Sequence, residues 1–341
     1  MSAVPASFSA FLVTKKSGEG DAAPGTRGVR ELSAMDLPAG EVTVRVHWSS
    51  VNFKDALAST QDGGVARISP LVPGVDVGGE VVEVNGTADF NVGDLVIAHG
   101  YDIGTGRHGA YSEYCRLAAS TVVPLPAGLT LRQAMAIGTA GFTAAQSVHA
   151  LERHGITNGN GPVLVTGATG GVGSAALSIL AQRGYEVVAS TGKAGEHEFL
   201  KSLGASEVID RTETSAESQR PLEKERWAAA VDCVGGSTLA YVLRTLKHSG
   251  AVAASGLTGG SGLNTTVLPF ILRNVALLGI DSVMIDMDLR RAIWRRCATD
   301  LRPAGIDDEL ITEIGLSGLD AALTTVKAGG ARGRYLVRVG G

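Results

Sequence analysis

The chain has 341 residues, 44% hydrophobic and 19% charged, which is enough to form two packed domains and excludes intrinsic disorder as its class. Its net charge of −4 gives no broad positive field, so we expect no nucleic acid partner. The start of the chain does not resemble a signal peptide, and no run of about 18 apolar residues occurs. We therefore expect a cytoplasmic protein with no membrane partner.

The first part of the chain, residues 1–135, has short alternating or β-branched segments separated by glycine and proline. The segments that predict strands are 41–51, 78–84, 93–100 and 110–117. This pattern predicts an irregular, β-rich domain.

Residues 136–285 alternate between the two periodicities. We expect strands at 162–167, 185–191, 206–210, 227–235 and 251–256, and helices at 143–155, 171–184, 196–204 and 237–250. Residues 211–226 predict a long polar loop. Strands that alternate with helices favour an α/β fold with a doubly wound parallel sheet.

Residues 286–341 interrupt this alternation with helices at 287–301 and 317–330 and a strand at 333–339. We expect this segment to return to the N-terminal domain and complete it. Two domains joined in this way would leave a cleft between them, which is a usual place for a ligand.

The most informative motif is the segment Val163–Gly173, in which an apolar strand leads into the turn GATGGVG and then a helix. Glycines let the backbone approach a pyrophosphate, and the helix N-terminus supplies free N–H groups and a positive dipole end. Its spacing is GxxGxxG, and its position within a series of strand–helix units indicates a dinucleotide site rather than a simple tight turn.

The second strand of this domain ends in Ser190–Lys193, where an NAD-binding enzyme would place a carboxylate for the ribose hydroxyl. Instead, the segment offers a hydroxyl, a backbone amide and an ammonium, which suit a 2′-phosphate. We therefore expect NADPH as the cofactor, with Arg220 as a second cation. The alternative for Lys193 and Arg220 is a solvated surface position.

The groups that alcohol oxidation requires are not apparent in the sequence. None of the six tyrosines is followed by lysine four positions later, and the three cysteines are far apart with no CxxC pair. Glu196-His197-Glu198 begins like a zinc motif, but Lys201 occupies the position of its second histidine. We expect no metal, and the remaining chemistry is hydride addition to an electron-poor carbon–carbon double bond.

Six segments together resemble one family, the acrylyl-CoA reductase branch of the zinc-free quinone oxidoreductases, within the medium-chain dehydrogenases/reductases. They are Ser49–Leu57, Pro73–Asp76, Ile137–Ala144, the glycine-rich turn, Arg220–Lys224 and Pro269–Val275. The resemblance implies a GroES-like catalytic domain, a Rossmann domain that binds NADPH, an acyl-CoA substrate and a homodimer joined through the Rossmann domains.

By motif position, the resemblance implies a set of cofactor contacts: Phe53, Thr169, Gly170, Gly171, Val172, Thr191, Gly192, Lys193, Arg220, Leu257, Ile271 and Ser282. For Leu257 and Ile271 the alternative is plain core packing. The family usually has tyrosine where this chain has Phe53, which cannot donate a proton. Asn52 is the candidate catalytic residue, either orienting cofactor or substrate or only fixing its loop.

Arg290, Arg291, Arg295 and Arg296 share one expected helix and form either a site for CoA phosphates or a solvated face. The favoured function is NADPH-dependent reduction of acrylyl-CoA to propanoyl-CoA. The alternatives are a quinone or enone reductase, and a non-catalytic NADPH-binding protein.

Overall fold

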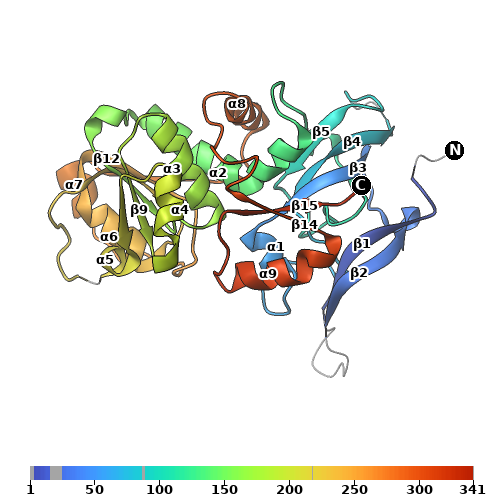
Figure 1. The fold of residues 1–341 in the computed structure, drawn as a ribbon, viewed down its shortest axis with the longest axis horizontal. Coiled ribbons are helices and arrows are strands. Elements are labelled where there is room, and N and C mark those ends of the chain that lie inside the picture. The colour runs from blue at the N-terminus through green and yellow to red at the C-terminus, as the bar shows by residue number, and fades with distance from the viewer. Residues whose placement is uncertain (1–3, 16–24, 87–88, 217, 341) are drawn as a thin grey trace. The chain divides into compact units, whose positions relative to one another are not determined.

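The computed structural model describes residues 4–15, 25–86, 89–216 and 218–340, and the chain divides into two compact units (Figure 1). Unit 1 combines Met1–Thr139, Val283–Arg291 and Ile306–Gly341. Unit 2 combines Ala140–Ser282 with Ala292–Gly305. The domain boundaries expected from the sequence, after residues 135 and 285, stay predictions.

In the described part of unit 1, a mixed sheet has the order β14-β15-β3-β4-β5-β7, and β6 also pairs with β3. Its strands are β3 (Val42–Val51), β4 (Asp76–Val84), β5 (Leu95–His99), β6 (Tyr114–Leu117), β7 (Val122–Pro124), β14 (Ile311–Gly315) and β15 (Arg334–Arg338). β15 runs antiparallel to β3 and pairs Tyr335 with Val51. The end of the chain therefore lies beside one of its earliest strands.

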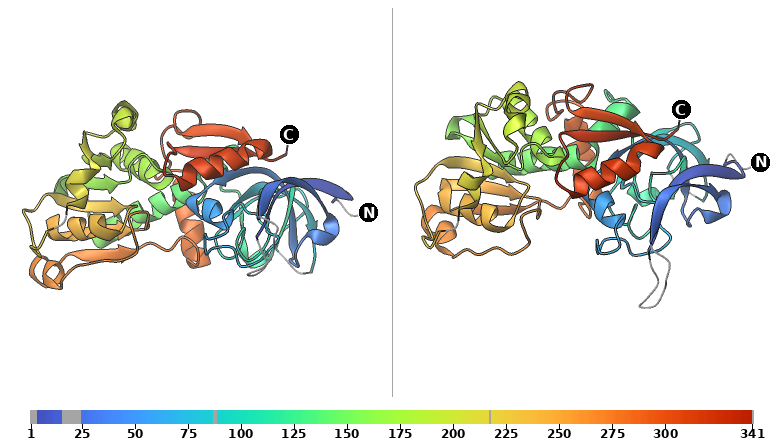
Figure 2. Two further views of the ribbon diagram at one scale, coloured as in Figure 1. Left: turned by 90° about the horizontal axis from the view of Figure 1, so that it is seen from below. Right: turned by 60° about the horizontal axis from the view of Figure 1, so that its bottom comes forward.

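A separate antiparallel ribbon of unit 1 contains β1 (Ser7–Thr14) and β2 (Thr26–Ser33), and it is visible in both views of Figure 2. The helices of this unit are α1 (Phe53–Ala58) and α9 (Leu319–Lys327), with the short 3-10 segments η1 (Ala34–Asp36), η2 (Ala119–Thr121) and η5 (Leu316–Gly318). α9 packs against α1 and β3. It buries Leu319, Ala322 and Leu323, which share one helical face because the last two follow Leu319 by three and four residues.

The core of unit 1 follows from the twofold alternation of β3. Val42, Val44 and Val46 are fully buried and pack with Val77 and Val81 of β4. Alternate residues of a strand point to the same face of the sheet, so these valines form one apolar layer.

In unit 2, the described strands form a parallel sheet with the order β10-β9-β8-β11-β12-β13. They are β8 (Val163–Thr166), β9 (Val187–Thr191), β10 (Glu207–Asp210), β11 (Trp227–Asp232), β12 (Leu246–Ala254) and β13 (Ala276–Gly279). This is the strand order of a Rossmann fold, in which the chain reverses direction across the sheet between the first and fourth strands. The predicted α/β class with a doubly wound sheet is confirmed.

Helices surround this sheet in the views of Figures 1 and 2. They are α3 (Gly171–Gln182), α4 (His197–Ser202), α5 (Arg211–Ser215), α6 (Gly236–Thr245) and α7 (Leu268–Arg273), with η3 (Asn158–Asn160) and η4 (Ala194–Glu196). Two further helices, α2 (Leu131–His154) and α8 (Met287–Cys297), each include residues assigned to both units. α2 is kinked at Gly138, where φ is 50°.

Two local predictions were wrong. The expected loop at 211–226 contains α5, whose first turn is capped when Thr212 N donates to Asp210 Oδ1 (2.8 Å). The expected helix at 237–250 ends at Thr245, because Leu246 is fully buried and pairs with Trp227 as the start of β12. Pairing across the sheet outweighs local helix propensity at this point.

Within the residues described, no helix is both long and apolar enough to cross a bilayer.

Candidate functional site

The glycine-rich turn lies at the carboxyl end of β8, between β9 and β11, where the strand order of the sheet reverses. Gly167 has a φ of 59°, and Gly170 N donates to Gly167 O (3.0 Å). A Cβ at Gly173 would clash with the Gly167 carbonyl, so α3 can pack this closely only with glycine there. In open α/β sheets, this reversal point is where ligands bind.

The start of α3 can hold an anion. Gly170 is the N-cap, and the first helical bond runs from Ser174 N to Gly170 O (2.9 Å), so the N–H groups of Gly171 and Val172 have no acceptor inside the helix. Thr169 is buried beside them. The predicted contacts Thr169, Gly170, Gly171 and Val172 therefore lie together in a backbone cradle suited to a pyrophosphate.

The second part of this cradle is the end of β9. Lys193 N donates to Thr191 Oγ1 (3.1 Å), and partial burial lowers the pKa of Lys193. A Cβ at Gly192 would clash with the side chain of Arg211, which therefore lies against this segment. Arg211 was not among the cofactor contacts predicted from the sequence. Its signal is strand pairing, since Asp210 pairs with Thr191 and Arg211 is the next residue.

The remaining predicted cofactor residues lie in several places. Arg220 is exposed, and no contact among those of the described residues joins it to the Thr191–Lys193 segment. Leu257 and Ile271 are 60% and 68% exposed, so the alternative of plain core packing is wrong for both. Ser282 is buried and its hydroxyl oxygen accepts a hydrogen bond from Thr143 Oγ1 (2.9 Å).

In unit 1, Asn52 and Phe53 lie at the start of α1. Asp55 caps the N-terminus of α1, because its Oδ2 accepts a hydrogen bond from Asn52 N (2.9 Å). Its Oδ1 accepts a second hydrogen bond, from Val75 N (2.9 Å). Phe53, at 37% exposure, is the neighbouring aromatic side chain. A carboxylate in the first turn of a helix also interacts favourably with its dipole.

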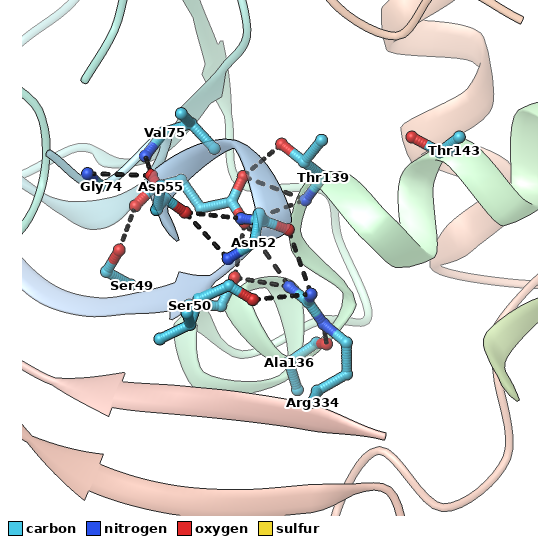
Figure 3. A network of polar contacts seen from close by, with 12 residues as sticks. Ser49, Ser50, Asn52, Asp55, Gly74, Val75, Ala136, Thr139, Thr143 and Arg334 are labelled. Carbon is cyan, nitrogen blue, oxygen red and sulfur yellow. Dashed lines mark hydrogen bonds and ion pairs between the residues drawn. The ribbon is translucent and has the colours of Figure 1, made fainter. Parts of the chain in front are cut away.

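Asn52 belongs to a buried polar network, and Figure 3 shows Asn52 and Arg334 pointing toward each other. Asn52 Nδ2 donates to Asp76 Oδ2 (2.8 Å), and Asn52 Oδ1 accepts from Arg334 Nη1 (3.1 Å). Both ends of the amide are thus engaged inside the protein. These contacts favour the role of fixing the loop, and the predicted orienting role stays a prediction.

Arg334 joins the Asp76 carboxylate to the backbone carbonyls of Val51 and Ala136. It is 4% exposed and lies 3.6 Å from Asp76 Oδ2. Burial and, second, the negative charge of Asp76 raise the pKa of Asp55 to about 6. A buried ion pair of this kind is stable only while every partner is present.

Thr139 links this network to the kink of α2. Its N–H and its hydroxyl both donate to Asp76, and Figure 3 shows the side chain facing the network. A Cβ at Gly138 would clash with polar atoms of Asp76, Ser50 and Arg334. The left-handed glycine therefore lets α2 approach the network closely.

The α8 arginines divide into two kinds, so neither sequence interpretation applies to all four. Arg290 is fully buried, so it lies neither on a solvated helix face nor on a surface that could bind CoA phosphates. Arg296 is mostly buried and pairs with Glu152 (2.8 Å), so the prediction of a solvated face is wrong for it as well. Arg291 and Arg295 are exposed, as both interpretations expect.

Over the described ranges, no group of three or more histidine, cysteine or acidic side chains is placed to hold a metal ion. Cys115 and Cys297 are buried and Cys233 is partly buried, all as free thiols. Burial raises the pKa of both Cys115 and Cys233 to about 12, so these thiols stay protonated at neutral pH.

A Rossmann unit and a β-rich unit in one chain are typical of the medium-chain dehydrogenases/reductases, and the family models agree with this class. Residues 38–127 match the alcohol dehydrogenase GroES-like domain, and residues 171–298 match the zinc-binding dehydrogenase domain. The predicted GroES-like domain is therefore confirmed.

Closer relatives place the chain within this class. It is 48% identical to the acrylyl-CoA reductase AcuI of Ruegeria pomeroyi, over 97% of this chain and 99% of that protein. The yhdH oxidoreductase of Salmonella enterica, solved in complex with NADP, is 44% identical with a TM-score of 0.92, covering 97% of this chain and all of that one. The yhfP protein of Bacillus subtilis, solved with NAD bound, has the same identity and TM-score and covers 97% and 99%.

The chain belongs to the quinone oxidoreductase-like branch of the medium-chain dehydrogenase/reductase family, which includes the acrylyl-CoA reductases. It is an oxidoreductase of the enoyl or quinone reductase type. The resemblance found from the six sequence segments is confirmed.

Proposed function

We propose that the protein uses NADPH to reduce acrylyl-CoA to propanoyl-CoA without a metal. The main support is the near full-length similarity to a protein named acrylyl-CoA reductase, together with the cationic end of β9 described above. The proposed reaction consumes acrylyl-CoA, NADPH and one proton and yields propanoyl-CoA and NADP⁺.

The residues present fit NADPH. The glycine cradle from Thr169 to Val172 would hold the pyrophosphate, because its N–H groups have no acceptor inside α3 and its glycines leave room for the backbone to approach. Lys193 and Arg211 would hold the 2′-phosphate with charge-assisted hydrogen bonds. Arg220 is a further proposed contact.

The bound NADPH would supply the hydride that adds to the β carbon of the double bond. The electron pair of that bond moves toward the thioester oxygen, and a proton then adds to the α carbon. Phe53 would pack against the nicotinamide ring as an apolar surface, because a phenyl group donates no hydrogen bond. Asn52, Leu257, Ile271 and Ser282 are the other proposed contacts of the site.

The test is to follow NADPH oxidation by purified protein with acrylyl-CoA, crotonyl-CoA and a simple quinone in parallel, and to repeat the best substrate with NADH. We expect the fastest turnover with acrylyl-CoA and NADPH. Turnover of the quinone alone would assign the quinone reductase function of the wider family and refute the CoA assignment. NADPH binding without any turnover would assign a binding protein, the alternative that Phe53 favours.

We also propose that two copies join through unit 2. Among the described strands, β13 lies at the edge of the sheet and has a neighbour on one side only. Leu277 on β13 and Leu272 on α7 are 39% and 59% exposed. Light scattering should give a dimer mass, and Leu277→Lys should give a monomer. Val92→Lys is the control, since Val92 is a 67% exposed apolar residue of unit 1. A monomeric wild type would refute the proposal.

A further inference from the structure

Unit 1 contains a small, mostly enclosed pocket with a volume of about 10 Å³. Its lining includes Lys54, Val75, Tyr101, Ile103, Thr139 and Val283. A space of this size admits about one water molecule. The terminal CH₂ of a vinyl group is of similar size, whereas every further carbon needs about as much space again.

The pocket lining is adjacent in sequence to Phe53, the proposed nicotinamide contact, and to Ser282, another proposed contact of the site. Lys54 directly follows Phe53, and Val283 directly follows Ser282. Because adjacent Cα atoms are only about 3.8 Å apart, the lining lies within one residue of two proposed cofactor contacts. A carbon that receives a hydride must lie beside the nicotinamide, so this pocket is placed to receive the end of the acyl chain.

Tyr101 occupies the pocket wall in an uncommon backbone conformation. Its φ is 52°, and it follows Gly100, whose φ is 84°. Bulky residues rarely adopt this left-handed region, and such outliers persist only where the surroundings hold them. Here Tyr101 N donates to Val283 O (3.2 Å), which fixes the backbone of the wall.

The Tyr101 ring is held by Arg290, whose guanidinium carbon lies 4.7 Å from the ring centroid. Arg290 is itself fully buried and donates to the carbonyls of His99 (2.8 Å) and Val283 (2.9 Å). The cation on the ring face adds an attraction to the packing. Since backbone and ring are both anchored, the Tyr101 side chain cannot swing aside to admit a longer chain without losing these contacts.

We propose that Tyr101 sets the acyl chain length, restricting the enzyme to the shortest 2-enoyl-CoA by closing the pocket behind the β carbon. This inference rests on the proposed function, since it names the part of the substrate that the same site excludes. It assigns Tyr101 a role in specificity that depends on the bulk of its ring and its fixed position.

The test compares kcat/KM for acrylyl-, crotonyl- and 2-hexenoyl-CoA in wild type, Tyr101→Gly and Tyr101→Phe. Glycine adopts a φ of 52° without strain, so Tyr101→Gly should fold, and Tyr101→Asn is a second small variant that tolerates this region. We expect the crotonyl to acrylyl ratio to rise at least about tenfold in Tyr101→Gly, because one carbon in a pocket is worth about ten- to 200-fold. Tyr101→Phe should keep the wild-type ratio.

Ser249→Gly is the matched control. Ser249 is an exposed residue of unit 2 with a φ of 59°, so this change also places glycine at a positive φ, but at a position distant in sequence from the pocket residues. It should keep the wild-type ratio. Wild type that reduces acrylyl-CoA, with the same ratio in both Tyr101→Gly and Tyr101→Asn, would refute the inference and leave the proposed function standing. Wild type that reduces no enoyl-CoA would refute the proposed function and the inference together.

Discussion

Replacing Arg334 by methionine should loosen the whole region around α1. The change removes hydrogen bonds to the carbonyls of Val51 (3.2 Å) and Ala136 (3.3 Å) and to Asn52 Oδ1 (3.1 Å), and it leaves Asp76 buried without this guanidinium. Breaking a buried ion pair by removing one partner typically costs about 3–5 kcal/mol. Methionine keeps much of the side-chain volume, so the loss is chiefly one of polar contacts.

Hydrogen exchange of the peptide spanning residues 42–58 measures this loss directly, because it reports the opening of β3 and α1. A cost of about 3–5 kcal/mol corresponds to exchange roughly a hundredfold to several thousandfold faster. Arg338→Met is the matched control on the same strand, since Arg338 is 59% exposed in its pair with Glu313 and should contribute less than about 1 kcal/mol. Equal exchange rates in the Arg334 and Arg338 variants would show that the buried contacts of Arg334 do not stabilise this region.

The other predictions concern the cofactor site, pH and the kink of α2. Lys193→Ala and Arg211→Ala should each raise KM for NADPH roughly ten- to 150-fold and leave NADH kinetics unchanged, and an equal rise for both cofactors would contradict a 2′-phosphate site. The folded state holds the Asp55 proton more tightly than the unfolded state, so stability from this group is present near pH 4 and is lost, by at most ~3 kcal/mol, as pH rises to about 6. Chemical denaturation across this range should show a smaller fall in Asp55→Asn, and parallel curves would count against the raised pKa. Gly138→Ala should lower the melting temperature more than Gly329→Ala, which has a similar positive φ but open space for a Cβ, and the reverse order would show that the clash at the network is unimportant.

The sequence allowed the local parts of the site to be predicted. β8, the glycine-rich turn and α3 are contiguous, and Lys193 follows the next strand, so motif spacing and chain order suffice to place them. Arg211 was missed because its place depends on the pairing of β10 with β9, which no local pattern encodes.

The buried network was not predictable for the same reason. Arg334 is one of several arginines near the C-terminus, and only the pairing of β15 with β3 brings it to Asn52 and Asp76. From the sequence alone an arginine is expected at the surface, because burying its charge is unfavourable without partners. Arg290 in α8 is a second case, since one of its partners is the backbone carbonyl of His99, far away in the sequence.

Isotope transfer is the decisive measurement for the proposed hydride addition to the β carbon of acrylyl-CoA. Wild-type protein is incubated with acrylyl-CoA and NADPH that carries deuterium at the transferable position of the nicotinamide, and the thioester product is analysed by mass spectrometry and NMR. We expect propanoyl-CoA with a single deuterium, located on the β carbon. Deuterium on the α carbon, or acrylyl-CoA recovered unchanged while a quinone in the same mixture is reduced, would contradict it.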